Sequence, residues 1–130
     1  MEHYVAYHST PYTETAFRPI GKAYGFYSRK HKNQLLEVIG NKVWMFSGTR
    51  ENKQMVYRLH GFYIASEVSE TEEDERFSYL VSGRGQLLKK PLPVSGLDWF
   101  QELYDEQNNF SFGMNRIKSS TVVAELEKLM

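Results

Sequence analysis

Cysteine is absent from the 130 residues of the chain. This absence excludes disulfide frameworks, thiolate nucleophiles and cysteine zinc sites, so a metal site would need histidine and carboxylate ligands. No apolar run approaches the roughly 18 residues that span a bilayer, and the N-terminal residues lack the basic and apolar regions of a signal peptide. We therefore expect a cytoplasmic protein with no membrane-spanning segment.

Catalytic motifs are missing as well. The sequence has no phosphate-loop glycine pattern, no Gly-x-Ser-x-Gly turn and no His-Glu-x-x-His motif. His3 and His8 lie on one expected strand at an odd spacing, which directs them to opposite faces and prevents them from sharing a metal. His60, on another expected strand, fits a partly buried structural role. We predict no catalytic residue, no cofactor and no metal site.

The composition is that of one globular domain. Hydrophobic residues make up 41% of the chain and charged residues 25%, which suits a single core at this length. We see no internal repeat and no linker. Residues 1–130 are therefore expected to form one domain.

Charge is balanced overall but separated along the chain. The net charge is zero, yet residues 15–64 hold nine lysines and arginines against two acids, and residues 67–75 hold six acids and no base. A neutral total can conceal one face that attracts anions. The acidic run is expected to be a solvated loop between strands.

Three elements are predicted before residue 49. Strand-forming residues fill Tyr4–His8, and a loop rich in proline and threonine follows over Ser9–Gly21. Apolar residues at helical spacing predict a helix over Lys32–Ile39, with Gly40 as its terminating glycine. Lys42–Gly48 is apolar on both faces, as a central strand would be.

The segment Gln54–Val68 follows an expected hairpin loop over Thr49–Lys53 and carries the strongest strand signal. Its apolar residues alternate with a period of two, but the phase slips by one residue at Gly61. The apolar set before this glycine is Met55, Tyr57 and Leu59, and the set after it is Phe62, Ile64 and Val68. Such a slip is typical of a β-bulge that bends a strand at a barrel corner, so it predicts a curled sheet.

The second half predicts two more strands and two helices. Arg76–Ser82 alternates, and prolines limit Gln86–Val94 to the edge of a sheet. Helices are predicted over Leu97–Gln107, where Ser95 resembles the start of a capping box, and over Ser119–Leu129. The expected fold class is therefore α+β: a curled sheet or pseudo-barrel of five or six mostly antiparallel strands with three helices.

Aromatic residues are unusually frequent, with nine Tyr, eight Phe and two Trp. Those on strong strand patterns fit a core: Trp44, Phe46, Phe62 and Tyr79. Others fall near the basic cluster Arg29–Lys32 or in the first loop: Tyr12, Phe17, Tyr24, Phe26 and Tyr27. Aromatic rings stack on nucleobases while lysine and arginine attract phosphates, so this mixture favours nucleic-acid binding. A second small core covered by loops is the alternative.

Short motifs over residues 1–68 carry a family resemblance. They are Ser9-Thr10-Pro11 after the first strand, Gly25-Phe26-Tyr27-Ser28, Asn33 near the helix start, Gly40-Asn41-Lys42-Val43-Trp44, and Gly61 followed by Ala65, Glu67 and Val68. Their order resembles the PUA-like superfamily, and most of all its EVE domains, which are relatives of the YTH domains. Ala23 stands where these domains usually have a tryptophan, and Tyr27 and Ser28 replace an arginine and an asparagine.

The resemblance implies a PUA-like pseudo-barrel that holds a modified or extruded base in an aromatic pocket and does no chemistry itself. We therefore expect a nucleic-acid-binding reader of DNA or RNA, which could work with a partner nuclease or helicase. The expected stacking residues are Tyr12, Tyr24, Phe26 and Tyr27. The expected hydrogen-bonding partners of a base edge are His8, Ser9, Ser28 and Asn33. The expected phosphate contacts are Arg29, Lys30 and Lys32.

Two other functions stay open from the sequence. A protein-interaction or regulatory domain would contact its partner through the acidic run and the C-terminal helices, and its aromatic residues would simply be core. A small hydrolase acting on a nucleotide-like ligand would need a general base, for which His8, His60 and the carboxylates are available.

Overall fold

The computed structural model describes residues 1–9, 23–28, 30–71, 78–110 and 114–130. Within these residues the chain forms one sheet with the strand order β2-β5-β4-β3-β1-β6. The strands are β1 (His3–Ser9), β2 (Ala23–Ser28), β3 (Lys42–Glu51), β4 (Gln54–Glu70), β5 (Tyr79–Pro93) and β6 (Asn115–Arg116). The helices are α1 (Lys32–Leu36), α2 (Phe100–Glu106), α3 (Ser120–Glu127) and the 3₁₀ helix η2 (Asn108–Phe110).

This architecture confirms the expected α+β class and the mostly antiparallel sheet. In the described sheet only β1 and β3 run parallel to each other. None of the helices in the described ranges is long and apolar enough to cross a bilayer. The loop expected over Ser9–Gly21 and most of the acidic run lie outside the described residues.

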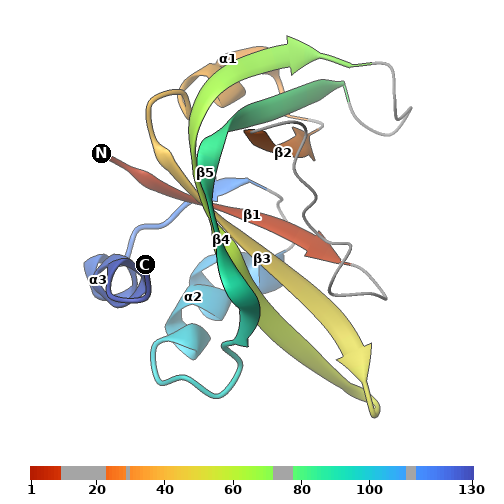
Figure 1. The fold of residues 1–130 in the computed structure, drawn as a ribbon, viewed down its shortest axis with the longest axis vertical. Coiled ribbons are helices and arrows are strands. Elements are labelled where there is room, and N and C mark those ends of the chain that lie inside the picture. Colours follow the sequence, from red (N-terminus) through yellow and green to blue (C-terminus); the bar gives the residue numbers. More distant parts are fainter. Residues whose placement is uncertain (10–22, 29, 72–77, 111–113) are drawn as a thin grey trace.

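The sheet curls into a half-barrel because β4 and β5 are long and bent. β4 pairs with β3 over residues 54–64 and with β5 over residues 58–70. Figure 1 shows these two strands sweeping from the end that holds α2 to the end that holds α1 and β2. The expected curled sheet is therefore present.

The phase slip predicted at Gly61 is present and has a defined geometry. In the pairing with β3, Leu59 lies opposite Phe46 and Gly61 lies opposite Met45. Two neighbouring residues of β3 thus face residues of β4 that are two apart, so His60 is an extra residue in β4. Gly61 has a φ of +149°, and a Cβ atom there would overlap the carbonyl oxygen of Gln86. The bend therefore requires glycine, because another residue would be strained and would collide with β5.

A second slip in β4 was not predicted. In the pairing with β5, the register shifts between Ala65 and Glu67. As a result Val68 packs with Tyr63 and Ala65, whereas Phe62 packs on the other side of the sheet. The expectation that Val68 shares a face with Phe62 is therefore wrong.

The two faces of the sheet bury separate apolar clusters. The outer core lies between the sheet and the helices α2, η2 and α3, and it includes Val5, Trp44, Phe46, Leu59, Leu103 and Leu126. The inner core fills the half-barrel against α1, and it includes Ala6, Leu35, Val43, Met45, Tyr63 and Val81. The four aromatic residues expected in the core do pack there: Trp44 and Phe46 are fully buried, and Phe62 and Tyr79 are partly buried.

Two element boundaries in the first half differ from the prediction. The helix expected over Lys32–Ile39 ends at Leu36, and a tight turn leads on to Gly40, which has a φ of +86°. The hairpin loop expected over Thr49–Lys53 shrinks to the two residues Asn52 and Lys53, both with positive φ. A two-residue turn of this kind matches the twist of the flanking strands, so β3 and β4 stay paired up to it.

The described parts of the strands expected over Arg76–Ser82 and Gln86–Val94 belong to one strand, β5. Up to Arg84 it lies between β2 and β4, whereas in the described sheet its second part pairs with β4 alone. The edge position predicted for Gln86–Val94 is therefore correct, but the break before it is wrong.

The predicted helix starts differ in their capping. Ser95 does not cap α2, because its hydroxyl oxygen accepts a hydrogen bond from the Tyr57 amide at 2.9 Å and the helix begins later, after Trp99. Ser119 does cap α3, since its hydroxyl oxygen accepts from the Val122 amide at 3.2 Å. The C-terminal helix expected over Ser119–Leu129 is thus present as Ser120–Glu127.

Gly61→Ala is expected to destabilise the protein by about 3 kcal/mol or more, because the added methyl group meets the β5 backbone in a strained conformation. Gly96→Ala is the matched control, since a Cβ atom at Gly96 meets nothing within 4 Å. Its effect should stay within about 0.5 kcal/mol. Urea denaturation measures both, and equal stabilities of the two variants would contradict the bulge account.

Candidate functional site

Three neighbouring strands change from apolar to polar side chains at the same level of the inner face. On β1 the change falls between Ala6 and His8, and on β3 it falls between their pairing partners Met45 and Ser47. On β4 the bulge residue His60 reaches the same face and contacts Ser47. We call this group the polar end of the half-barrel, and it comprises His8, Ser47, Thr49, Glu51, Arg58 and His60.

Ser47 and His60 form the buried centre of the polar end. The hydroxyl oxygen of Ser47 and Nε2 of His60 lie 2.6 Å apart. Ser47 is fully buried and His60 is 6% exposed. Burial, followed by the nearby charges of Arg58 and His8, lowers the pKa of His60 to about 4. The imidazole is therefore neutral at physiological pH.

Arg58 and Glu51 form a fixed ion pair next to this centre. The guanidinium donates from Nη1 to Glu51 Oε2 at 2.6 Å and from Nη2 to Oε1 at 3.2 Å. Thr49 joins the network, because its hydroxyl donates to Glu51 at 2.7 Å and accepts from Arg58 at 3.0 Å. These hydrogen bonds hold the pKa of Glu51 below its ordinary value, so the carboxylate stays charged and cancels the charge of Arg58.

The Ser47–His60 contact has the distance of a nucleophile and its base, but its surroundings favour hydrogen bonding over proton transfer. Ser47 is buried in a regular strand, and a histidine with a pKa of about 4 is a weak base at neutral pH. Among the residues that the structure describes, no group of three or more histidines and carboxylates could hold a metal ion. The polar end is thus suited to bind a ligand by hydrogen bonds.

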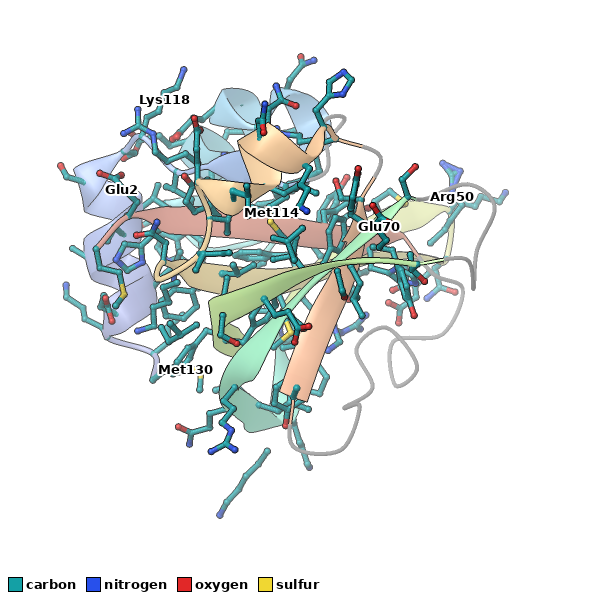
Figure 2. All side chains as sticks on the ribbon, turned by 90° about the horizontal axis from the view of Figure 1, so that it is seen from above. Glu2, Arg50, Glu70, Met114, Lys118 and Met130 are labelled. Atoms are coloured by element: carbon teal, nitrogen blue, oxygen red, sulfur yellow. The ribbon has the colours of Figure 1, made fainter. Side chains whose placement is uncertain are left out.

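Lys30 lies where the half-barrel closes. Its ammonium group donates to the Met114 carbonyl oxygen and to Asn115 Oδ1 at 2.7 Å, which links the end of β2 to β6, the outer strand at the opposite edge of the sheet. Figure 2 places Met114 in the middle of the molecule. Burial lowers the pKa of Lys30. Contact with a phosphate would therefore require Lys30 to leave these partners.

The aromatic residues predicted on β2 are separated by the strand. Tyr24 and Phe26 pack against the inner core, and by alternation Tyr27 lies on the opposite face. Ser28 is buried, and its hydroxyl oxygen accepts from the Lys30 amide at 3.1 Å. These four residues therefore do not line one common surface.

The remaining predicted residues have mixed positions. Lys32 and Asn33 are exposed at the start of α1, and His8 is exposed at the end of β1. Tyr12, Arg29 and the side chain of Ser9 lie outside the described residues. His8 is the member of the predicted set that the structure places in the polar end.

Ser47, Thr49 and Arg58 were missed by the sequence prediction. Lys42–Gly48 reads as a strand covered on both sides, which conceals the polar change within it. The signal was available in the alternate residues of β3, which run from apolar to polar in the order Val43, Met45, Ser47, Thr49 and Glu51. Because the hairpin was predicted too long, this alternation was cut off before its polar half.

No known family model matches the chain, and no curated protein is significantly similar to it in sequence. The similarity of residues 1–68 to PUA-like domains therefore stays a prediction from short motifs.

Stability is expected to fall as the pH drops from 6.5 towards 4, because the unfolded state protonates His60 at a higher pH than the folded state does. Full titration of one such group costs up to about 1.4 kcal/mol per pH unit. Urea denaturation of the wild type and of His60→Gln across this range isolates the contribution, since glutamine does not titrate. Equal pH dependence of the two proteins would show that His60 is not held neutral.

Lys30→Met is expected to destabilise the protein by about 2 kcal/mol, because two hydrogen bonds from a charged donor are lost at the closure of the half-barrel. Lys32→Met is the matched control on an exposed lysine and should stay within about 0.5 kcal/mol. Thermal denaturation compares the two variants. Equal melting temperatures of the two variants would show that the hydrogen bonds of Lys30 to Met114 and Asn115 do not stabilise the protein.

Proposed function

We propose that this protein binds nucleic acid and that an unstacked base enters the half-barrel at the polar end. The coordinated change from apolar to polar residues on β1, β3 and β4 carries this proposal. Buried polar side chains are costly, and apolar residues at Ser47 and Thr49 would simply extend the inner core. An apolar wall with a few directed polar groups is suited to a flat heterocycle with a polar edge.

Exposed cations supply the expected phosphate contacts. The exposed lysines and arginines that form no ion pair with any described residue include Lys32, Arg50, Lys53, Lys89 and Lys90. Arg50 lies near the end of β3 and Lys53 in the turn to β4, the two strands that carry most of the polar end. Lys89 and Lys90 follow Leu87, the β5 partner of Gly61. Cations around a neutral base site are typical of proteins that bind single strands.

The family of the domain and its individual base contacts are part of the same proposal. The half-barrel is compatible with a PUA-like pseudo-barrel, and we propose an EVE-like domain that does no chemistry of its own. Tyr24 and Phe26 then support the wall of the base site from the inner core. Stacking by Tyr12 and Tyr27 and base contacts by Ser9 and Asn33 stay predictions, as do DNA or RNA as the ligand and a partner nuclease or helicase.

A protein-interaction domain is the second candidate, and an apolar pair at the end of α1 and in the turn after it favours it. Leu36 is 44% exposed and Ile39 is 39% exposed, three residues apart along one turn. An exposed apolar pair of this size suits a small protein contact. This candidate predicts that the protein does not bind nucleic acid at low salt.

Binding should depend on salt. Fluorescence anisotropy with labelled single-stranded DNA and RNA of about ten nucleotides should detect binding, and three to four phosphate contacts predict an affinity loss of about 20- to 50-fold between about 50 and 200 mM salt. The double variant Arg50→Gln and Lys53→Gln should weaken this dependence, because it removes two of the cations.

Lys118→Gln is the matched control for this titration, since Figure 2 places Lys118 and Arg50 on opposite sides of the molecule. Its salt dependence should equal that of the wild type. Absence of binding to every strand at the lower salt concentration would refute the proposed function and favour the second candidate.

A further inference from the structure

The buried imidazole of His3 on β1 joins β3 to the C-terminal helix α3. Its Nδ1 atom lies 2.9 Å from Nε1 of Trp44 on β3, and its Nε2 atom lies 3.4 Å from a carboxylate oxygen of Glu127 on α3. His3 is 8% exposed, and Trp44 is fully buried in the outer core. The two nitrogens of one ring therefore face two partners of opposite chemistry, a donor and an anion.

Trp44 fixes the tautomer of His3. An indole nitrogen only donates hydrogen bonds, so Nδ1 of His3 is the acceptor and carries no proton. The one proton of the neutral ring is then on Nε2, which faces the Glu127 carboxylate. The opposite ring orientation would bring Cδ2 against the indole and leave a buried donor unpaired, whereas every buried side-chain nitrogen and oxygen of the described residues has a partner.

A second proton does not fit this arrangement. It would bind to Nδ1, and two N–H groups would then oppose each other at 2.9 Å. Because neither group accepts a hydrogen bond, the contact is lost and the ring has to turn away from Trp44. The charged ring is still attracted by Glu127, whose side chain is 46% exposed and offers a partner at the surface.

Charged groups on each neighbouring element act on the His3 ring. Glu127 on α3 favours the charged ring, whereas Lys42 on β3 opposes it and binds Glu127 at 2.9 Å. At the start of the chain the terminal amine opposes the charge and Glu2 favours it, and Glu2 is paired with Arg116 of β6 at 3.2 Å. Burial is the largest effect and lowers the pKa of His3 below its ordinary value. The ring is therefore neutral at physiological pH and gains its proton in mild acid.

We propose that His3 is a pH-sensitive latch on the outer core: the neutral ring holds Trp44, and the protonated ring releases Trp44 and binds Glu127 alone. The Lys42 ammonium lies 4.8 Å from the centre of the Trp44 ring, and the Phe62 ring packs against the same indole with centroids 5.6 Å apart. Release therefore loosens the outer core where β1, β3 and α3 meet. The inner core contains neither His3 nor Trp44 and keeps its contacts.

Nuclear magnetic resonance of the ¹⁵N-labelled full-length protein from about pH 7.5 to about pH 5 tests the latch. At the upper pH the His3 ring should carry its proton on Nε2. On acidification the indole signal of Trp44 should move towards that of a free indole with the same midpoint as the His3 ring, below about pH 6.5. The indole signal of Trp99, whose ring contacts Phe100 instead, should not follow this midpoint.

His60, with a pKa of about 4, stays largely neutral in this range and does not interfere. A Trp44 signal that stays in place while His3 titrates would overturn the proposal, as would a proton on Nδ1 at the upper pH. Simultaneous loss of the inner-core signals of Met45 and Tyr63 would also overturn it, because the protein would then unfold as a whole.

Three variants separate the latch from a merely structural histidine. His3→Asn keeps an acceptor near the position of Nδ1 but does not titrate, so the Trp44 signal should lose its pH dependence. Glu127→Gln removes the charge that favours the protonated ring, so the midpoint should move to lower pH. Glu125→Gln is the matched control on the same helix, because Glu125 pairs with Lys128, and it should leave the midpoint in place. Equal midpoints in the two glutamate variants would contradict the role of Glu127.

Discussion

The extra residue in β4 is the constraint on which the rest of the structure depends. Because His60 interrupts the alternation, Leu59 and Phe62 both face the outer core, and Tyr63 turns to the inner core. One strand can therefore bend and cover both clusters, which curls the sheet into a half-barrel. The same bulge directs the His60 imidazole to Ser47 on the neighbouring strand. Fold and candidate site thus share one local cause, which the backbone conformation of Gly61 permits.

The sequence predicted this bend because a glycine and a phase slip coincide at residue 61. It did not predict the slip at Ala65 and Glu67, since no glycine or change of pattern marks that place. The change to polar residues along β3 is visible in its local alternation, but its meeting with His8 of β1 is not. His8 and Ser47 are brought together by parallel pairing across an intervening strand and helix, and a register of this kind is set by the whole sheet.

Lys30 illustrates the same limit for charge. A basic cluster before a helix predicts a surface that attracts phosphates, yet the partners of Lys30 are Met114 and Asn115, which lie more than eighty residues further along the chain. The residues next to Lys30 in the sequence therefore do not reveal that it links β2 to β6. The exposed cations Arg50 and Lys53 lie instead at the β3–β4 hairpin.

The central claim is that a base enters the half-barrel at the polar end. A nuclear magnetic resonance titration of the ¹⁵N-labelled protein with a short single-stranded oligonucleotide tests it most directly. The account predicts that the amide signals of His8, Ser47, Arg58 and His60 move together on binding, while signals from α3 stay in place. Movement confined to α1, α2 or α3, with the signals of the polar end unchanged, would contradict it.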